Sequence, residues 1–190
     1  EDGGGAAIAV GFPHFDNCVF HQCSASGNGG AVLIQNYAGP TFTNCQFTDN
    51  WAQKGGAIYV TESSAVVLNG CDVSNNQGWW YGGGLYLLDE CVASIVNSTI
   101  VGNYGSMQGG GIYSQWGTVD LSDSVVEANH ASSGGGMSFV SGDGIIQNVD
   151  FKDNVAKVGG HLSIANMDAD TAFVQISDSN FCGAELPIDG

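Results

Sequence analysis

A Gly-Gly pair followed by small and apolar residues recurs along the chain, and this internal repeat constrains the fold more than any other feature. The pairs begin at residues 4, 29, 55, 82, 109, 134 and 159, so consecutive copies lie 25 to 27 residues apart. Seven copies with this spacing indicate seven similar structural units. A unit this short cannot bury a hydrophobic core alone, so each unit must stack on its neighbours.

A second block follows each glycine pair and predicts a tight bend between two short apolar segments. Its third position is Asn, Asp or Gly in every copy, and these residues adopt positive φ at low cost. We therefore expect this column to be structural. Its members are Asn17, Asn44, Gly70, Asn97, Asp123, Asn148 and Asp178.

Each repeat is predicted to contain three short strands separated by three bends. In one repeat these strands are residues 58–60, a second strand that ends at Leu68, and residues 71–73. No segment has the 3.6-residue period of an amphipathic helix, and each strand can pair in parallel with its counterpart one repeat away. Parallel crossovers are generally right-handed. The sequence thus predicts an all-β, single-domain, right-handed parallel β-helix over residues 1–190, with about seven coils.

Two runs of the sequence resemble a known repeat. Phe47-Thr48-Asp49-Asn50 followed by Gly55-Gly56-Ala57-Ile58 is similar to the FxxN and GGAI signatures of chlamydial polymorphic outer-membrane proteins. Phe151-Lys152-Asp153-Asn154 followed by Gly159-Gly160 is a second match. The pectin-lyase superfamily shares the expected architecture, including an asparagine ladder at a bend. The middle copies depart from the chlamydial pattern, since they carry Val73, Ile100 and Val126 in place of Phe.

An asparagine column lies three residues after the end of the second block. Stacked side-chain amides can hydrogen-bond to one another and to the carbonyl groups of a bend, which satisfies backbone groups that would otherwise be buried without partners. We therefore favour a structural ladder over a polar binding stripe. The column consists of Asn50, Asn76, Asn103, Asn129 and Asn154.

Three of the six cysteines, Cys18, Cys45 and Cys71, share one inward column with small residues. Buried thiols pack as small hydrophobic groups. Neighbouring coils also bring Cα atoms within the range of a disulfide, which leaves open one bridge among these three. No Cys or His spacing indicates zinc, and no metal site is expected.

Aromatic residues are the least expected feature of the predicted surface. They follow the asparagine column or occupy an outward column of the first strand, and together they could cover the middle coils. Two interpretations are open: a surface for a partner, or a loop that packs on a tyrosine ladder. The candidate binding residues are Trp51, Tyr59, Trp79, Trp80, Tyr81, Tyr86, Tyr104 and Tyr113.

The charge balance excludes several function classes. The chain has 3 lysines, no arginine and 19 acidic residues, which gives a formal net charge of −16. Such a surface repels phosphate backbones and anionic lipids, so we expect no nucleic-acid partner. No apolar run approaches the roughly 20 residues that span a bilayer, so we expect no direct membrane insertion. We expect no cofactor beyond incidental Ca²⁺, and an extracellular or cell-surface location.

Aspartates on the outer face raise the question of catalysis, because β-helices that cleave polysaccharides use paired acids there. The lysines do not cluster around these acids, and nearly minimal coils leave no long loops for a substrate cleft. A solvated acidic surface is therefore favoured, and we assign no catalytic residue. The aspartates at these outward or bend positions are Asp49, Asp72, Asp120, Asp150 and Asp153.

Asn97-Ser98-Thr99 matches the acceptor motif for N-glycosylation. Because Asn97 occupies the predicted bend, its side chain could point outward. A chance match explains the motif equally well, so glycosylation of Asn97 stays open.

Three functions are compatible with the sequence. We favour a non-catalytic extracellular module, an adhesin or filament building block, that binds protein or glycan partners through the aromatic residues. A polysaccharide-binding or polysaccharide-modifying protein is the alternative, and an ice-binding protein is third because the outward columns lack a threonine array.

Neither end shows a polar or helical cap, including the tail at residues 183–190. We expect further coils or a neighbouring subunit as partners there, so that the chain is a fragment or subunit of a larger assembly.

Overall fold

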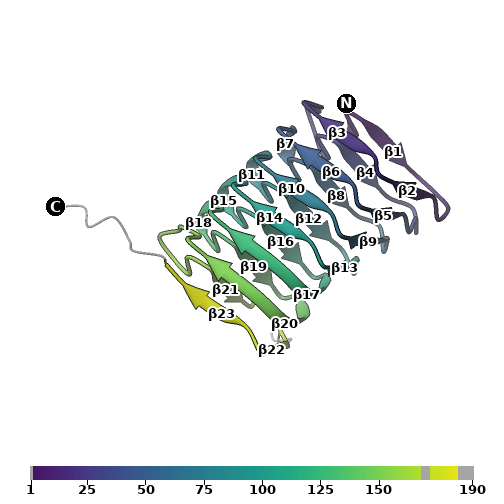
Figure 1. Ribbon diagram of the computed structural model, residues 1–190. Helices are drawn as coiled ribbons and strands as arrows, with labels where there is room; N and C mark the ends of the chain where they lie inside the picture. Colours follow the sequence, from purple (N-terminus) through teal and green to yellow (C-terminus); the bar gives the residue numbers. More distant parts are fainter. Residues whose placement is uncertain (1, 168–171, 184–190) are drawn as a thin grey trace.

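The computed structural model describes residues 2–167 and 172–183, and its paired strands all run parallel (Figure 1). The chain winds as a solenoid, and the described part contains strands and no helix. The prediction of an all-β parallel β-helix of about seven turns is therefore confirmed. The predicted tail beyond residue 183 lies outside the described residues.

Sheet A contains the strand that follows each glycine pair. Corresponding residues pair one coil apart without a shift of register, as in Tyr59 with Tyr86 and Tyr86 with Tyr113. The strands are β1 (Ala6–Ile8), β4 (Val32–Ile34), β8 (Ile58–Val60), β12 (Leu85–Leu88), β16 (Ile112–Gln115), β19 (Met137–Val140) and β21 (Leu162–Ala165).

Sheet B contains the second and third predicted strands as two adjacent rows. In two coils the strands of both rows fuse into ten-residue strands, β17 (Thr118–Glu127) and β20 (Asp143–Lys152), which continue through the bend. The first row is β2 (His14–Asp16), β5 (Thr41–Thr43), β9 (Ala65–Asn69), β13 (Val92–Val96) and β22 (Val174–Ser177). The second row is β3 (Val19–His21), β6 (Gln46–Thr48), β10 (Asp72–Ser74), β14 (Thr99–Val101) and β23 (Asn180–Cys182).

Sheet C is an addition to the three strands predicted for each coil. It begins directly after the asparagine column, where the sequence predicted a loop. Its register is interrupted by an irregularity in the middle of the strands, as between Gly78 and Tyr81. The strands are β7 (Trp51–Lys54), β11 (Gln77–Tyr81), β15 (Tyr104–Gln108) and β18 (His130–Ser133).

The core fills the inside of the coils with stacked apolar side chains. Phe42 packs in parallel on Phe15, with ring centroids 4.8 Å apart, and Phe47 packs on Phe20 at 4.9 Å. In the next coils the equivalent positions hold aliphatic residues such as Leu68 and Ile95, which are fully buried. Identical or similar residues therefore stack one coil apart, which explains why the repeat period is kept.

Exposed apolar side chains remain on the end coils. At one end these include Phe12 and Val19, and at the other Phe173, Ile176 and Phe181. Among the described residues, no helix is long and apolar enough to cross a bilayer.

Positive φ recurs in regular columns at the bends, and two of these columns flank the second row of sheet B. All seven residues of the predicted column, from Asn17 to Asp178, have φ between 50° and 65°. A second column directly precedes the asparagine column, and the sequence analysis missed it because it contains residues that do not favour positive φ. Its members are Gln22, Asp49, Asn75, Gly102, Ala128, Asp153 and Gly183.

Replacing Asn97 by valine should destabilise the protein by about 1–3 kcal/mol, because φ at this position is 52° and a β-branched residue is strained there. Asn97→Gly is the matched control and should be nearly neutral, since glycine adopts this conformation without a steric cost. Urea titrations of the three proteins measure the effect. An unchanged midpoint for Asn97→Val would contradict the assignment of a strained bend.

Candidate binding site

The asparagine column forms a continuous buried ladder. Within each step the side-chain Oδ1 of one asparagine accepts hydrogen bonds from the backbone N–H and the Nδ2 of the asparagine in the preceding coil. For Asn103 both distances from Asn76 are 2.9 Å. Asn103 Nδ2 in turn donates to Asn129 Oδ1 at 3.0 Å and to the carbonyl oxygen of Val73 at 2.8 Å. Because these amides are buried and bonded to one another, they are not available to a ligand.

The column of small residues after the first bend forms a second ladder. Ser98 Oγ accepts from the backbone N–H of Cys71 at 3.0 Å, and Ser124 Oγ accepts from Ser98 N–H at 3.0 Å. In the same position Cys45 Sγ accepts from Cys18 N–H at 3.4 Å. The six cysteines, all of which are described, are free thiols, so the structure contains none of the bridges left open among Cys18, Cys45 and Cys71.

Three of the eight candidate aromatic residues are buried, which corrects their assignment to an exposed face. Tyr59, Tyr86 and Tyr113 are 6%, 2% and 4% exposed, although they point to the outer side of sheet A. Their rings stack on one another with centroids 5.0 Å apart. The reason is the turn at the glycine pair, which brings the last residues of sheet C over them. Tyr81 stacks on Tyr113 at 5.0 Å, and Lys54 Nζ lies 5.8 Å from the centre of the Tyr86 ring.

The buried tyrosine stack predicts a loss of stability at alkaline pH. Burial raises the pKa of Tyr113 to about 12 and also raises the pKa values of Tyr59 and Tyr86 above that of a free tyrosine, which is about 10. A raised pKa in the folded state means that the unfolded state loses its proton first. The contribution of these tyrosines to the free energy of unfolding should therefore be fully present below pH 10 and fall as the pH rises toward 12.

Thermal unfolding at a series of pH values measures this effect. The double variant Tyr86→Phe, Tyr113→Phe is the control, because it keeps the rings and removes two of the groups that ionise. The decline should be shallower in the variant. An equally steep decline in both proteins would show that the tyrosine stack does not cause it.

Exposed aromatic side chains lie over sheet C. Trp79 and Trp80 of β11 are 55% and 38% exposed, and Tyr104 of β15 is 40% exposed. Met107 is also exposed, and Trp51 and Tyr81 are partly buried. We name the exposed residues Trp79, Trp80, Tyr104 and Met107 the aromatic patch of sheet C.

A cavity of about 240 Å³ lies within this patch. Its lining residues are Gln77, Trp79, Tyr104 and Ser106. One face of Tyr104 is covered by His130 of the next coil, since the rings are 5.4 Å apart and nearly parallel. Gln77 lies in the coil before Tyr104, and the two residues pair between β11 and β15. The exposed side chain of Gln77 has no hydrogen bond within the described part of the chain. The cavity thus combines two aromatic rings with an amide that is free to bind.

Ser106 fixes the geometry of this cavity. Its hydroxyl donates a hydrogen bond to the carbonyl oxygen of Trp79, which ties β15 to β11 beside the aromatic rings. Ser132 Oγ donates to the carbonyl oxygen of Ser106 at 2.8 Å and extends the connection to β18. Sequence reasoning missed Gln77 and Ser106, because nothing in their local pattern indicates the fourth strand that brings them together.

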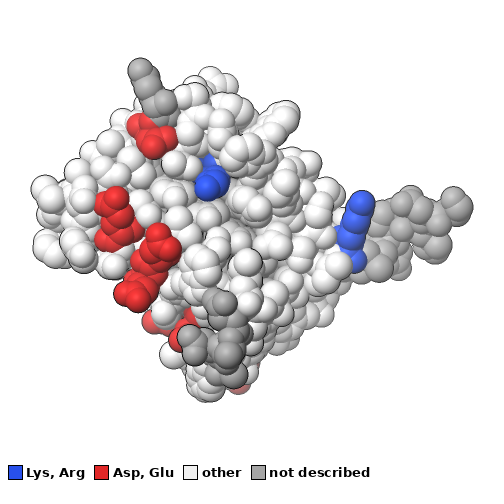
Figure 2. Space-filling model, turned by 180° about the vertical axis from the view of Figure 1, so that it is seen from behind, with Lys and Arg blue, Asp and Glu red and all other residues white. Residues whose placement is uncertain are grey.

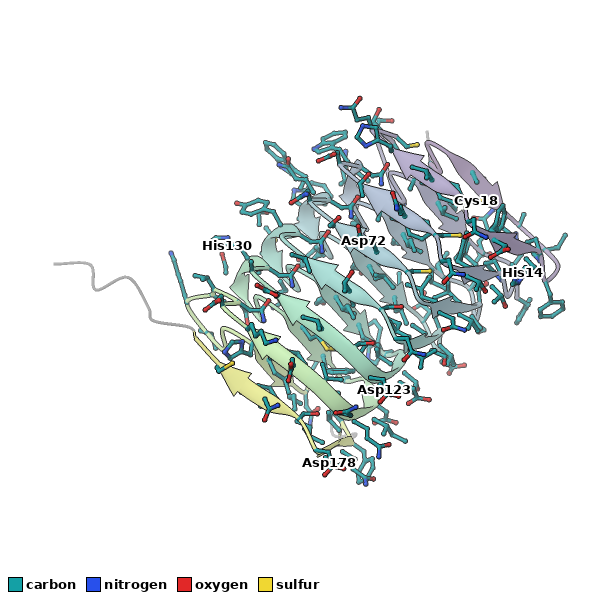
Figure 3. The ribbon with its side chains drawn as sticks, in the orientation of Figure 1. His14, Cys18, Asp72, Asp123, His130 and Asp178 are labelled. Carbon is teal, nitrogen blue, oxygen red and sulfur yellow. The ribbon has the colours of Figure 1, made fainter. Side chains whose placement is uncertain are left out.

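The acidic and histidine side chains do not form a comparable site. Figure 3 shows that His14, Asp72, Asp123, His130 and Asp178 lie far apart on the solenoid. In residues 2–167 and 172–183, no group of three or more His, Cys, Asp or Glu side chains could hold a metal ion. The two ion pairs found within the described residues are local: His21 lies 3.4 Å from Asp49, and Lys152 lies 3.0 Å from Asp150.

Comparison with known proteins agrees with this geometry. The family model described as "Right handed beta helix region" matches residues 3–156. The chain belongs to the right-handed β-helix family. The match supports the wider relationship to pectin-lyase-like β-helices, whereas the likeness to chlamydial repeats stays a prediction. Searches of curated proteins and of solved structures found no significant match. Membership of the right-handed β-helix family fixes the scaffold and leaves the function to the surface of this particular chain.

The predicted glycosylation acceptor is exposed on this β-helix. Asn97 lies in the bend of sheet B, with its side chain at the surface. Ser98 is buried, and its hydroxyl donates to the carbonyl oxygen of Val96 at 2.8 Å. Asn97, through the bend, and Ser98, through its hydrogen bond, are therefore held in place by the solenoid.

Proposed function

We propose that the protein is a non-catalytic adhesive module of an extracellular or cell-surface protein, and that it binds glycans through the aromatic patch of sheet C. The observation that carries this proposal is the cavity in which Trp79 and Tyr104 present aromatic surface beside the unpaired amide of Gln77. Exposed apolar surface of this kind is typical of a binding site.

The chemistry of the patch suits a sugar. The C–H faces of a sugar ring pack on aromatic rings, while its hydroxyl groups both donate and accept hydrogen bonds. The amide of Gln77 can do the same in return. The residues that line the cavity carry no formal charge, so a neutral glycan can bind there without removing water from a charged group.

Binding to a glycan array, followed by calorimetric titration with the glycans that bind, tests the proposal. Trp79→Ala and Tyr104→Ala should each weaken binding at least tenfold, which corresponds to about 1.4 kcal/mol. The thermal midpoint of both variants should stay close to that of the parent, because both side chains are exposed.

Trp116→Ala is the matched control. Trp116 is exposed like the patch residues, but it lies between β16 and β17, outside sheet C. Its replacement should leave glycan binding unchanged. Equal losses for Trp79→Ala and Trp116→Ala, or the absence of any bound glycan, would contradict the proposal. Binding to a protein ligand alone would also contradict it.

A further inference from the structure

The tyrosine stack on the outer side of sheet A ends after Tyr113. The next residues of the same column are Ser138 and Ser163, which pair in register with Tyr113 and with each other. A hydroxymethyl group fills far less space than a phenol ring. The side chains of sheet C that face this column also become smaller from coil to coil, from Tyr81 and Gln108 to Ser133.

A cavity of about 280 Å³ lies next to the end of the stack. Residues of sheet C contribute one wall, and outward residues of three sheet A strands contribute the other. The lining residues are Tyr81, Gln108, Tyr113, Gln115, Val140, Ala165 and Met167. This cavity shares no lining residue with the one between Trp79 and Tyr104.

Gln108 gives this cavity an unusual property. Its Oε1 atom is buried and has no hydrogen-bond partner, and it is the one such side-chain atom found among the described residues. A buried polar atom without a partner destabilises a folded protein, so an acceptor retained in such a position points to a ligand that supplies the donor. The other amide oxygen of the cavity differs in this respect, because Gln115 Oε1 accepts from Tyr86 OH at 3.3 Å and from Tyr113 OH at 3.4 Å.

We propose that this cavity is a second, separate binding site that takes one neutral sugar ring. A sugar hydroxyl donates to Gln108 Oε1, and the C–H face of the ring packs on Tyr81 and Tyr113. The volume is just below the range of drug-sized ligand pockets, which fits a ligand of a single ring.

Charge also favours a neutral ligand. None of the lining residues is charged. Figure 2 views the molecule from behind, where sheet A lies, and shows acidic side chains gathered toward one side with one lysine close to them. A broad region without charge lies between this lysine and the one at the opposite side. An anionic ligand would meet the net charge of −16, and a cationic one would find no carboxylate in the cavity.

This inference rests on the proposed function only for the class of ligand, since the two sites share no lining residue. The test is a ¹H–¹⁵N NMR titration of the whole chain with methyl glycosides of glucose, galactose, mannose and N-acetylglucosamine. At least one of them should shift the side-chain amide signals of Gln108 and Gln115. If all four leave both amides unchanged, the proposal is wrong.

Two variants localise the binding. Gln108→Leu removes the acceptor at similar volume, and Ala165→Trp places a large side chain in the cavity from an exposed position. Each should weaken binding of the glycoside at least tenfold. Gln77→Leu is the matched control, because it makes the same substitution in the other cavity, and it should leave this titration unchanged.

Thermal unfolding supplies a readout that does not depend on the ligand. Without sugar, Gln108→Leu should be at least as stable as the parent, because the unpaired acceptor is gone. A lower midpoint would show that Gln108 has a structural partner and would overturn the proposal. Loss of the Gln108 shifts in Trp79→Ala would show that there is one site rather than two. Gln108 shifts without any glycan binding at sheet C would contradict the proposed function and leave this site in place.

Discussion

Asn103→Leu should lower the free energy of unfolding by about 3–5 kcal/mol, the largest effect of any single side-chain removal that we expect here. Asn103 lies at the centre of the ladder and is fully buried. Without its amide, the backbone N–H and the Nδ2 of Asn76 lose their shared acceptor, and the carbonyl oxygen of Val73 loses its donor. Each buried group left unpaired costs about 1–3 kcal/mol.

Asn69→Leu is the control for this substitution. Asn69 ends β9, its side chain is exposed, and it makes no side-chain hydrogen bond in the described structure. Its replacement should change stability by less than about 0.5 kcal/mol. Urea titrations of both variants measure the difference. Equal midpoints would contradict the structural role assigned to the ladder.

Gly110→Ala should cost about 3 kcal/mol, because the coils approach each other most closely at the second glycine of the pair. A Cβ atom on Gly110 would lie well inside 3.0 Å of the carbonyl oxygens of Gly135 and His130. Both oxygens belong to the backbone of the next coil, so the clash is relieved only by separating the two coils. The φ angle of Gly110 is not positive, so the expected loss is steric.

Gly111→Ala is the matched control, in the column that directly follows the pair. That column already carries alanine in two repeats, as Ala31 and Ala57, whereas the column of Gly110 is glycine in all seven. Gly111→Ala should therefore be the milder change. Thermal unfolding of both variants measures this contrast, and a Gly110→Ala protein as stable as Gly111→Ala would mean that the close approach of the coils does not limit the choice of residue.

Most of the fold could be predicted from the repeat, for a physical reason. Gly110 and its equivalents mark the close contact of adjacent coils, and Asn97 and its equivalents mark a bend with positive φ. Both demands are met by very few residue types, so they are visible in the sequence. The core positions between them need only be apolar, and they hold Phe42, Leu68 or Ile95 in successive coils.

Sheet C could not be predicted in the same way. The segment of β11, Gln77–Tyr81, contains a glycine and three consecutive aromatic residues, and it has no alternation of polar and apolar residues. Its conformation depends on pairing with the next coil. The bend before it occurs at residues such as Gln22 and Ala128, which do not favour positive φ in isolation.

The burial of the tyrosine stack was hidden for a related reason. Alternation along β8 places Tyr59 on the outer side of sheet A, and this placement is correct. Tyr86 and Tyr113 are covered by Tyr81 of sheet C, and this contact between two different sheets is not visible in the pattern of either strand. Sequence alone therefore identified the aromatic residues and could not separate the buried ones from the exposed ones.

The most direct test of the binding surface uses the four tryptophans as reporters. Trp79 and Trp80 belong to the aromatic patch of sheet C, and Trp116 lies outside it. In a ¹H–¹⁵N spectrum the indole N–H of each tryptophan gives its own signal, assigned by single replacement with phenylalanine. On addition of a glycan that the protein binds, the signals of Trp79 and Trp80 should shift while that of Trp116 stays in place. A shift of Trp116 alone, or unchanged signals of Trp79 and Trp80 at saturation, would contradict the account.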